Sequence, residues 1–252
     1  MDLRFYDGLA SSYHLLFEDW DRTIARQSKV LAPLLSERGP ETRLKILDCA
    51  CGIGTQALGF AALGHQVVAS DISPGAVNRA RREAQARSLA ITFHISDMTS
   101  LEEITEGSFD VIAALDNALP HLTREELGKS IRAIAARLKL GGRLLASIRD
   151  YDALIVKRPA IQEPAMFGDG GSRRIVHQVW DWTGGESYTV HLYLTVETKD
   201  GWKVQHFVSQ YRCLLREELT AHLAANGFAE IRWMMPEQTG FYQPLVLATL
   251  AH

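Results

Sequence analysis

The sequence predicts an α/β fold built on a doubly wound, mostly parallel β-sheet. Between residues 45 and 148, short apolar runs typical of buried strands alternate with segments of helical character. Gly52 and Gly54 form a tight turn between the first apolar run and the first of these helices. Polar residues, most of them Asp, follow the apolar runs directly. Because ligands of open parallel sheets bind outside the carboxyl ends of the strands, these residues indicate a site at that edge.

Length and composition narrow the class of protein. A chain of 252 residues can bury one α/β domain with a modest insertion. The net charge of -3 gives no electrostatic reason to expect nucleic acid or an anionic membrane as a partner. No apolar run has the length of a membrane span, and no basic-then-apolar leader opens the chain. We therefore expect a cytoplasmic protein that binds neither nucleic acid nor membrane.

The cysteines give no sign of a metal site or a disulfide framework. Cys49, Cys51 and Cys213 are an odd number. Cys49-x-Cys51 could suggest a zinc or redox pair, but no second pair or nearby histidine completes such a site. We expect small, buried, reduced side chains that line the loop, and no bound metal.

The first 40 residues are expected to form a helical cover. They are rich in aromatic residues, and apolar side chains at positions 24, 31, 34 and 35 follow a helical repeat.

The following segment alternates strands and helices, as a doubly wound sheet requires. A helix from Gln56 to Ala62 follows the glycine turn, and Ser73-Pro74 caps a second helix. A capping box of Thr123 and Glu126 opens a third helix, which runs to Leu138 and is expected to stop at Gly141-Gly142. The first predicted strand ends at residue 48. The other four cover residues 67–71, 91–95, 109–117 and 143–148.

The pattern changes after residue 174 to strands that alternate without helices between them. These strands cover residues 175–182, 188–198 and 202–211, with glycine-containing turns between them. A helix over 215–226 and a strand pair over 229–235 and 245–250 complete the chain. We therefore predict one domain with a Rossmann-like, seven-stranded sheet. Its parts are an N-terminal cover (1–40), a cofactor-binding core (41–150 and 213–252) and an antiparallel lid insertion (151–212).

Two readings of the glycine turn stay open on the residues alone. Gly52-x-Gly54-x-x-Ala57 fits the dinucleotide fingerprint of an NAD(P)-dependent dehydrogenase. Asp48, directly before the turn, and the Asp116-Asn117 pair count against that reading. A regulatory protein that binds a cofactor without catalysis is a further alternative.

Three segments carry a resemblance to a known family: Asp48-Cys49-Ala50-Cys51-Gly52-Ile53-Gly54, Leu115-Asp116-Asn117-Ala118-Leu119-Pro120-His121-Leu122 and Ile148-Arg149-Asp150-Tyr151-Asp152. With these, the chain resembles the class I S-adenosylmethionine-dependent methyltransferases, and among them the glycine/sarcosine N-methyltransferase-like branch. Ala50 stands where the commonest loop pattern has its first glycine. The resemblance implies S-adenosylmethionine as cofactor, S-adenosylhomocysteine as product, and a small amine or amino acid such as glycine or sarcosine as acceptor. Another small N- or O-nucleophile is the alternative acceptor.

The candidate cofactor residues follow from the strand ends and the resemblance. Asp71 suits a bidentate acceptor for the two ribose hydroxyls. Asp97 and Met98 are expected to frame the adenine, and Leu115 to offer backbone near the transferring methyl group. The resemblance implies that the N-terminal cover reaches the methionine part through Tyr13, Trp20 and Arg26, with Arg22 as the alternative to Arg26. The remaining candidates are Asp48, Ala50, Cys51, Gly52, Gly54 and Ile72.

The candidate acceptor residues are suited to positioning a carboxylate. The Arg149 guanidinium can bind a carboxylate through two parallel hydrogen bonds, and the Asn117 amide can contact the same group. The alternative for Arg149 is a salt bridge to Asp150 or Asp152. His121 could accept a proton, orient its loop or simply pack. Tyr151 and Tyr211 are candidate hydroxyl donors, with strand packing as the alternative.

Overall fold

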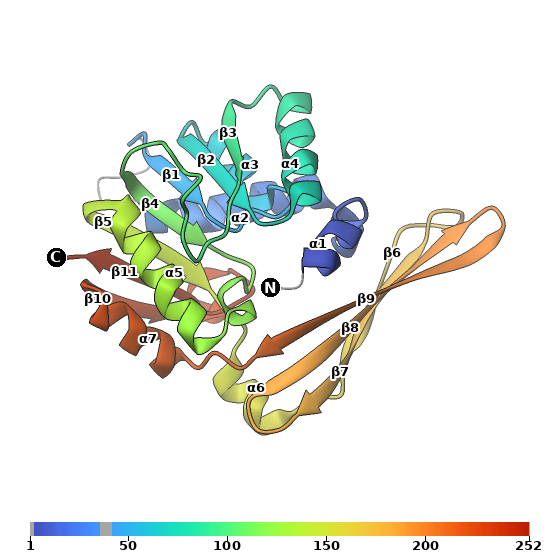
Figure 1. The fold of residues 1–252 in the computed structure, drawn as a ribbon. Helices are drawn as coiled ribbons and strands as arrows, with labels where there is room; N and C mark the ends of the chain where they lie inside the picture. The colour runs from blue at the N-terminus through green and yellow to red at the C-terminus, as the bar shows by residue number, and fades with distance from the viewer. Residues whose placement is uncertain (1–2, 36–41, 252) are drawn as a thin grey trace.

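A computed structural model describes residues 3–35 and 42–251. In this part of the chain, seven strands form one mostly parallel sheet in the order β10-β11-β5-β4-β1-β2-β3 (Figure 1). Only β11 runs antiparallel to its neighbours β5 and β10. The predicted α/β, Rossmann-like sheet with a final antiparallel pair is confirmed. The strands are β1 (Lys45–Asp48), β2 (Gln66–Asp71), β3 (Ile91–Ile95), β4 (Phe109–Ala114), β5 (Leu138–Ser147), β10 (Phe228–Met234) and β11 (Leu245–Leu250).

The order of the strands reverses between β1 and β4. β1 pairs in parallel with β2 on one side and with β4 on the other. Helices cover both faces of the sheet, with α2 and α3 on one face and α5 and α7 on the other (Figure 1). Because both faces are covered, the side chains of Ile46, Leu47 and Ile112 are fully buried. The helices are α1 (Leu3–Leu9), α2 (Trp20–Leu35), α3 (Thr55–Ala62), α4 (Pro74–Ala86), α5 (Arg124–Arg137), α6 (Tyr151–Lys157), α7 (Arg216–Ala225) and α8 (Pro236–Thr239), with 3-10 turns η1 (Tyr13–Leu16) and η2 (Leu119–His121).

A second, four-stranded antiparallel sheet lies beside the core sheet in the order β6-β7-β8-β9 (Figure 1). Three of these strands were predicted, whereas β6 and helix α6 were not. α1 lies between the two sheets, and the ring of Phe5 in α1 is 6.3 Å from that of Phe207 in β9. The strands are β6 (Ile161–Phe167), β7 (Arg174–Thr183), β8 (Ser187–Thr198) and β9 (Gly201–Arg212).

The end of α5 corrects one prediction. The helix ends at Arg137 and β5 begins at once, so Gly141-Gly142 lie inside a strand and do not stop the helix. A Cβ on Gly142 would lie 2.8 Å from the Lys139 carbonyl oxygen and 3.1 Å from that of Phe109. The glycine therefore serves a close backbone approach, where the pairing of β4 with β5 changes register.

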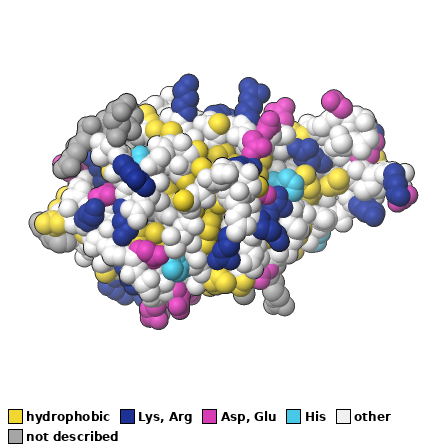
Figure 2. All heavy atoms as spheres, turned by 90° about the horizontal axis from the view of Figure 1, so that it is seen from above, with side chains coloured by type: hydrophobic (Ala, Val, Ile, Leu, Met, Phe, Trp, Pro, Cys, Tyr) yellow, Lys and Arg dark blue, Asp and Glu magenta, His cyan; other side chains and the backbone are white. Residues whose placement is uncertain are grey.

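The surface seen from above mixes both signs of charge. Figure 2 shows Lys and Arg side chains interspersed with Asp and Glu, around hydrophobic side chains in the middle of this face. Among the described residues, no helix combines the length and the apolar character that crossing a membrane requires.

Candidate active site

The loops after β1, β2, β4 and β5 meet at one edge of the core sheet and line three neighbouring cavities. Two are narrow, with volumes of about 40 and 30 Å³, and share Ala50 and Asp71 in their walls. The third has a volume of about 640 Å³ and shares Tyr6, Tyr13 and Asp116 with the first. The strand-end residues thus border one continuous series of cavities.

The glycine loop after β1 leaves its backbone open to the first narrow cavity. Gly52 has a φ of +52°, and a Cβ built on it would meet no atom within 4 Å. Gly54, with a φ of +96°, is the N-cap residue directly before α3. A Cβ on Gly54 would lie 3.2 Å from the Cβ of Ala80 in α4. Gly52 therefore leaves room for a ligand, whereas Gly54 allows helices α3 and α4 to pack closely.

The carboxylate of Asp71 is held in a fixed orientation between the two narrow cavities. Its Oδ2 accepts a hydrogen bond of 2.9 Å from the Gly52 amide, and its Oδ1 accepts one of 2.9 Å from the Ser73 amide. The side chain is 8% exposed, and burial raises its pKa while these amides act in the opposite direction. Two oriented acceptor oxygens at this position suit a pair of hydroxyl groups on a bound ligand.

Most of the candidate cofactor residues line the narrow cavities. Tyr13, Cys51 and Leu115 border the first, whereas Ile72, Asp97 and Met98 border the second. Tyr6 also lies in the wall of the first narrow cavity.

Four candidate cofactor residues do not line these cavities: Gly54, described above, and Arg26, Trp20 and Asp48. Arg26 is exposed on α2 and is not among the residues that line the cavities, and the alternative Arg22 is exposed too. Trp20 packs against the start of α3, where its Nε1 donates to Thr55 Oγ1 at 2.9 Å. Asp48 is buried beneath the glycine loop, and this burial raises its pKa to about 8. The structure therefore assigns Trp20 and Asp48 to supporting the loop, and it does not bring Arg26 to the site.

The turn after β4 contains two non-glycine residues in the left-handed region, Asp116 at φ +56° and Asn117 at φ +67°. The Asp116 amide donates to Ser147 Oγ at 2.8 Å. Asn117 Oδ1 accepts hydrogen bonds of 3.0 Å from the Arg149 amide and from the Tyr151 hydroxyl. These bonds hold a backbone conformation that is unfavourable for most side chains.

Asn117 also presents a free donor. Its Nδ2 is buried and has no hydrogen-bond partner among the described residues, and Asn117 lines the large cavity. A buried amide nitrogen without a partner carries a desolvation cost that a ligand oxygen would remove.

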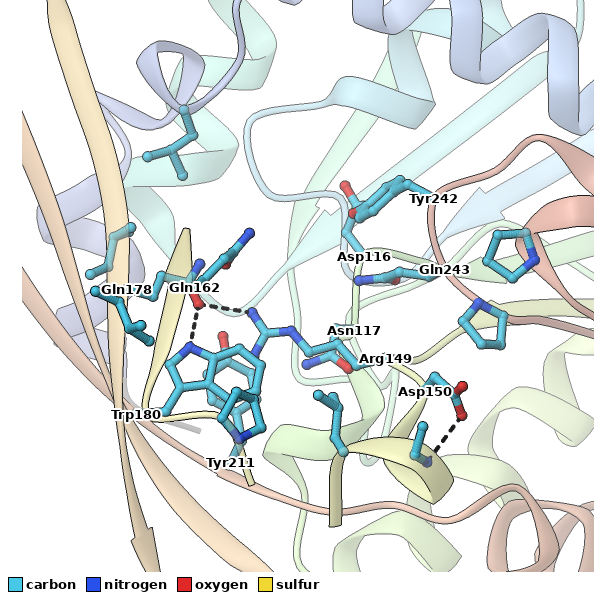
Figure 3. A pocket seen from close by; sticks show the side chains of 18 of the residues that line it. Asp116, Asn117, Arg149, Asp150, Gln162, Gln178, Trp180, Tyr211, Tyr242 and Gln243 are labelled. Atoms are coloured by element: carbon cyan, nitrogen blue, oxygen red, sulfur yellow. Dashed lines mark hydrogen bonds between the residues drawn. The ribbon is translucent and has the colours of Figure 1, made fainter. Parts of the chain in front are cut away.

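Arg149 extends into the large cavity from the end of β5 (Figure 3). Its guanidinium donates to Tyr188 Oη at 2.8 Å and to Gln178 Oε1 at 3.3 Å. Its Cζ lies 4.8 Å from the centre of the Trp180 ring and 5.1 Å from that of Tyr211. All of these contacts come from the antiparallel sheet, so this second sheet supplies the surroundings of the cation.

No carboxylate of the described residues pairs with Arg149. The expected alternative partners, Asp150 and Asp152, bind Arg216 instead, at 2.7 and 3.4 Å. The alternative of a strand-end salt bridge is therefore wrong. An arginine side chain is always charged, and placing it in a cavity without a counter-charge is unfavourable unless a ligand supplies one.

His121 and Tyr151 lie behind the cavity wall. His121 Nε2 is 2.6 Å from the hydroxyl of Tyr6, a residue that lines two cavities. Burial, with a contribution from the positive charge of Arg149, lowers the pKa of His121 to about 3, so the ring is neutral at pH 7. His121 is thus arranged to orient Tyr6, and Tyr151 to hold Asn117.

Sequence reasoning missed several residues of the large cavity. Tyr242 and Gln243 come from the loop before β11, and Gln178 and Trp180 come from β7. None of them stands in a motif, so only the folded topology brings them to the site. Asp116 was noted in the sequence but was not assigned a role.

Comparisons with known proteins agree with this architecture. Residues 46–142 match a family model described as a methyltransferase domain. The chain is 30% identical over 146 residues to the glycine/sarcosine N-methyltransferase of Parasynechococcus marenigrum, covering 58% of this chain and 51% of that protein. It is 33% identical over 103 residues to a ubiquinone biosynthesis O-methyltransferase of Xanthomonas oryzae, covering 41% of this chain and 42% of that protein. The chain thus spans about half the length of these curated relatives.

Solved structures match nearly the whole fold. The sugar N-methyltransferase KedS8 from a Streptoalloteichus species has a TM-score of 0.77 at 19% identity and covers 95% of this chain and 93% of its own. CalS10 from Micromonospora echinaspora, an amino pentose methyltransferase solved with S-adenosylmethionine bound, has a TM-score of 0.74 at 21% identity and covers 95% of both chains. At these identities the likeness concerns the fold.

The neutral state of His121 leads to a prediction about stability. Its pKa of about 3 in the folded protein lies below the ordinary value of about 6.5, so unfolding takes up a proton in this range. The free energy of unfolding should fall as the pH is lowered from 7 to 4, and His121 should contribute at most about 1.4 kcal/mol per pH unit. Denaturant unfolding of wild type and His121→Gln across this range should give a shallower dependence for the variant. Equal dependences would contradict the neutral, buried state of His121.

Proposed function

We propose that this protein is an S-adenosylmethionine-dependent methyltransferase that methylates the amine of a small carboxylate-bearing molecule. The observation that carries the proposal is the Arg149 guanidinium, which has no carboxylate partner among the described residues and lies in a cavity next to the two narrow ones. An acceptor carboxylate would supply the missing negative charge.

The cofactor is S-adenosylmethionine, which supplies an electrophilic methyl group on a sulfonium when bound. Asp71 offers two oriented acceptors for the ribose hydroxyls, and Gly52 leaves its backbone bare beside them. Ile72 and Met98 provide apolar walls for the adenine, and Asp97 a hydrogen-bond acceptor. We assign the first narrow cavity to the cofactor and the large cavity to the acceptor. Tyr13 borders both, so its ring can shield the reacting groups from water.

Methyl transfer to nitrogen asks for positioning more than for covalent help. An amine attacks in line with the sulfur–methyl bond, and correct orientation alone can contribute on the order of 7–11 kcal/mol. Arg149 can bind both oxygens of a carboxylate, and the free Nδ2 of Asn117 can donate to the same group. Tyr188, Trp180 and Tyr211 fix the guanidinium and thereby the direction from which the acceptor approaches.

The size of the large cavity bears on the acceptor. A volume of about 640 Å³ lies in the range of small-molecule sites and exceeds the volume of glycine or sarcosine. Glycine, sarcosine or a relative is our first candidate, and the volume leaves room for a bulkier amino acid.

An amino sugar is the second candidate acceptor. The two structural neighbours described above are an N-methyltransferase of sugars and a methyltransferase of an amino pentose, and they match the fold over 95% of this chain. Gln162, Gln178 and Gln243 in the cavity wall could bind hydroxyl groups. These neutral side chains do not balance the positive charge of Arg149. An amino sugar would therefore need an anionic group of its own to pair with Arg149.

Asp71→Ala tests the cofactor assignment. Loss of the charged acceptor should weaken binding of S-adenosylhomocysteine by about 2–4 kcal/mol, since hydrogen bonds to charged groups contribute about 1.5–3 kcal/mol each and two bonds to one carboxylate are not fully additive. Calorimetric titration of wild type, Asp71→Ala and the exposed control Asp169→Ala would measure this loss, with thermal unfolding as a check of the fold. Unchanged affinity in Asp71→Ala, or binding of NADH in place of S-adenosylhomocysteine, would contradict the assignment.

Arg149→Lys tests the acceptor class. The substitution keeps the charge and removes the planar pair of donors, so kcat/KM for a carboxylate-bearing amine should fall by about 10- to 150-fold, or about 1.5–3 kcal/mol. Binding of S-adenosylhomocysteine should be unchanged, and the exposed Arg158→Lys should behave as wild type.

The matching experiment replaces the carboxylate of the acceptor with an amide. Wild type should lose as much kcat/KM on the amide as Arg149→Lys loses on the acid, and the variant should lose little more on the amide, because both changes remove one interaction. Losses that multiply independently would mean that Arg149 serves the fold and does not bind the carboxylate.

A further inference from the structure

Asp116 is a carboxylate that the proposed roles leave unused. It lines both the large cavity and the first narrow cavity, a position it shares with Tyr6 and Tyr13. In Figure 3 it lies with Tyr242 above the Arg149 side chain. It therefore borders the place where the acceptor cavity joins the cofactor cavity.

The hydrogen bonds of Asp116 orient its two oxygens without neutralising them. The Tyr242 hydroxyl donates to Oδ1 at 2.6 Å, and the Gln56 amide donates to Oδ2 at 2.8 Å. Tyr242 is half exposed toward the cavity that it lines. No lysine or arginine of the described residues pairs with Asp116. This carboxylate is thus fixed in direction and has capacity for a cationic or hydrogen-bonding ligand.

The backbone at Asp116 has a strained, left-handed conformation. Its φ of +56° is a conformation that glycine adopts without cost and that other side chains disfavour. The Ser147 hydroxyl and the Asn117 side chain hold the turn in place. Strained non-glycine residues cluster at functional sites, and this one carries a carboxylate into a ligand cavity.

We propose that Asp116 binds the acceptor's amine and takes a proton from it before methyl transfer. The inference rests on the proposed function and adds the catalytic residue that the amine meets. With Arg149 on the carboxylate, the two residues form a dipolar site for a zwitterionic amino acid.

An alkylammonium ion gives one proton to the Asp116 carboxylate, which becomes a carboxylic acid, and the amine nitrogen regains its lone pair. This pair forms the bond to the methyl carbon while the carbon–sulfur bond breaks and its electrons stay on sulfur. The positive charge moves from sulfur to the methylated nitrogen, and Asp116 returns its proton to solvent after the products leave.

The surroundings of Asp116 favour a proton acceptor over a permanently ionised carboxylate. Burial raises its pKa, while the hydrogen bonds from Tyr242 and Gln56 limit the rise. The titratable and charged groups around it are the phenols of Tyr242 and Tyr13, the buried Asp48, and Arg149, whose charge acts on both phenols. Asp116 must be ionised to accept the proton, so activity should be lost on the acid side as it becomes protonated.

Asp116→Asn tests the proposal, because it removes the charge and keeps the shape. With the best amine found in a panel of amino acids and amino sugars, kcat/KM should fall by about 100- to 10,000-fold, the usual contribution of a general base. The acid-side decline of kcat/KM with pH seen in wild type should disappear in the variant. S-adenosylhomocysteine should bind the variant as it binds wild type. The same amine should bind more weakly to the variant loaded with S-adenosylhomocysteine, measured by calorimetry.

Two further variants keep the test decisive. Asp116→Gly suits the left-handed backbone, so it should fold and show the same losses even if the asparagine variant is unstable. Asp169→Asn removes an exposed carboxylate that lines none of the three cavities and should keep the wild-type pH profile.

The outcomes separate this inference from the proposed function. A methylating wild type with an Asp116→Asn variant of similar kcat/KM and pH profile would overturn the role of Asp116 alone. A variant that loses affinity for S-adenosylhomocysteine as strongly as it loses activity would assign Asp116 to the cofactor and overturn it too. A wild type that binds S-adenosylhomocysteine but methylates no amine would overturn both proposals.

Discussion

The hydrogen bonds of the Asn117 side chain join the ends of β4 and β5, and the wall of the large cavity depends on that junction. One amide oxygen accepts both the backbone N–H of Arg149 and the hydroxyl of Tyr151. The left-handed turn of Asp116 and Asn117 is held open by these bonds and by Ser147, which also donates to Gln243. An acid, an amide and a guanidinium from the ends of two neighbouring strands thereby line one cavity next to the two narrow ones. The topology brings the strand ends together, and this network fixes the directions of their side chains.

Much of the core follows from local sequence signals. Buried strands between helices must carry continuous apolar runs, and the glycine turn, the Ser73-Pro74 cap and the Thr123 capping box mark helix starts that the structure contains. Parallel strands align their carboxyl ends, which is why Asp71 and Asn117 could be named before the structure. Gly141-Gly142 were misread because glycine marks both helix ends and close backbone approaches, and only the pairing with β4 tells them apart.

The rest of the candidate site depends on contacts between distant segments. Tyr242 reaches Asp116 across 126 positions, and Tyr188 reaches Arg149 across 39. No periodicity or motif links these positions, so these pairs form only when the antiparallel sheet and the loop before β11 pack at the edge of the core sheet. The N-terminal cover illustrates the same point, because the sequence does not show which of its side chains face a cavity. Tyr13 lines two cavities, whereas Arg26 on α2 is exposed to solvent.

The central claim is that a methyl group passes from S-adenosylmethionine to the nitrogen of an anionic amine. The most direct measurement uses S-adenosylmethionine with a ¹³C-labelled methyl group, a mixture of amino acids, amino sugars and phenols, and NMR of the labelled products. The position of the labelled carbon signal distinguishes a methyl group on nitrogen from one on oxygen. The account predicts label on the nitrogen of a carboxylate-bearing amine. Label on oxygen alone, or no labelled product from any acceptor, would contradict it.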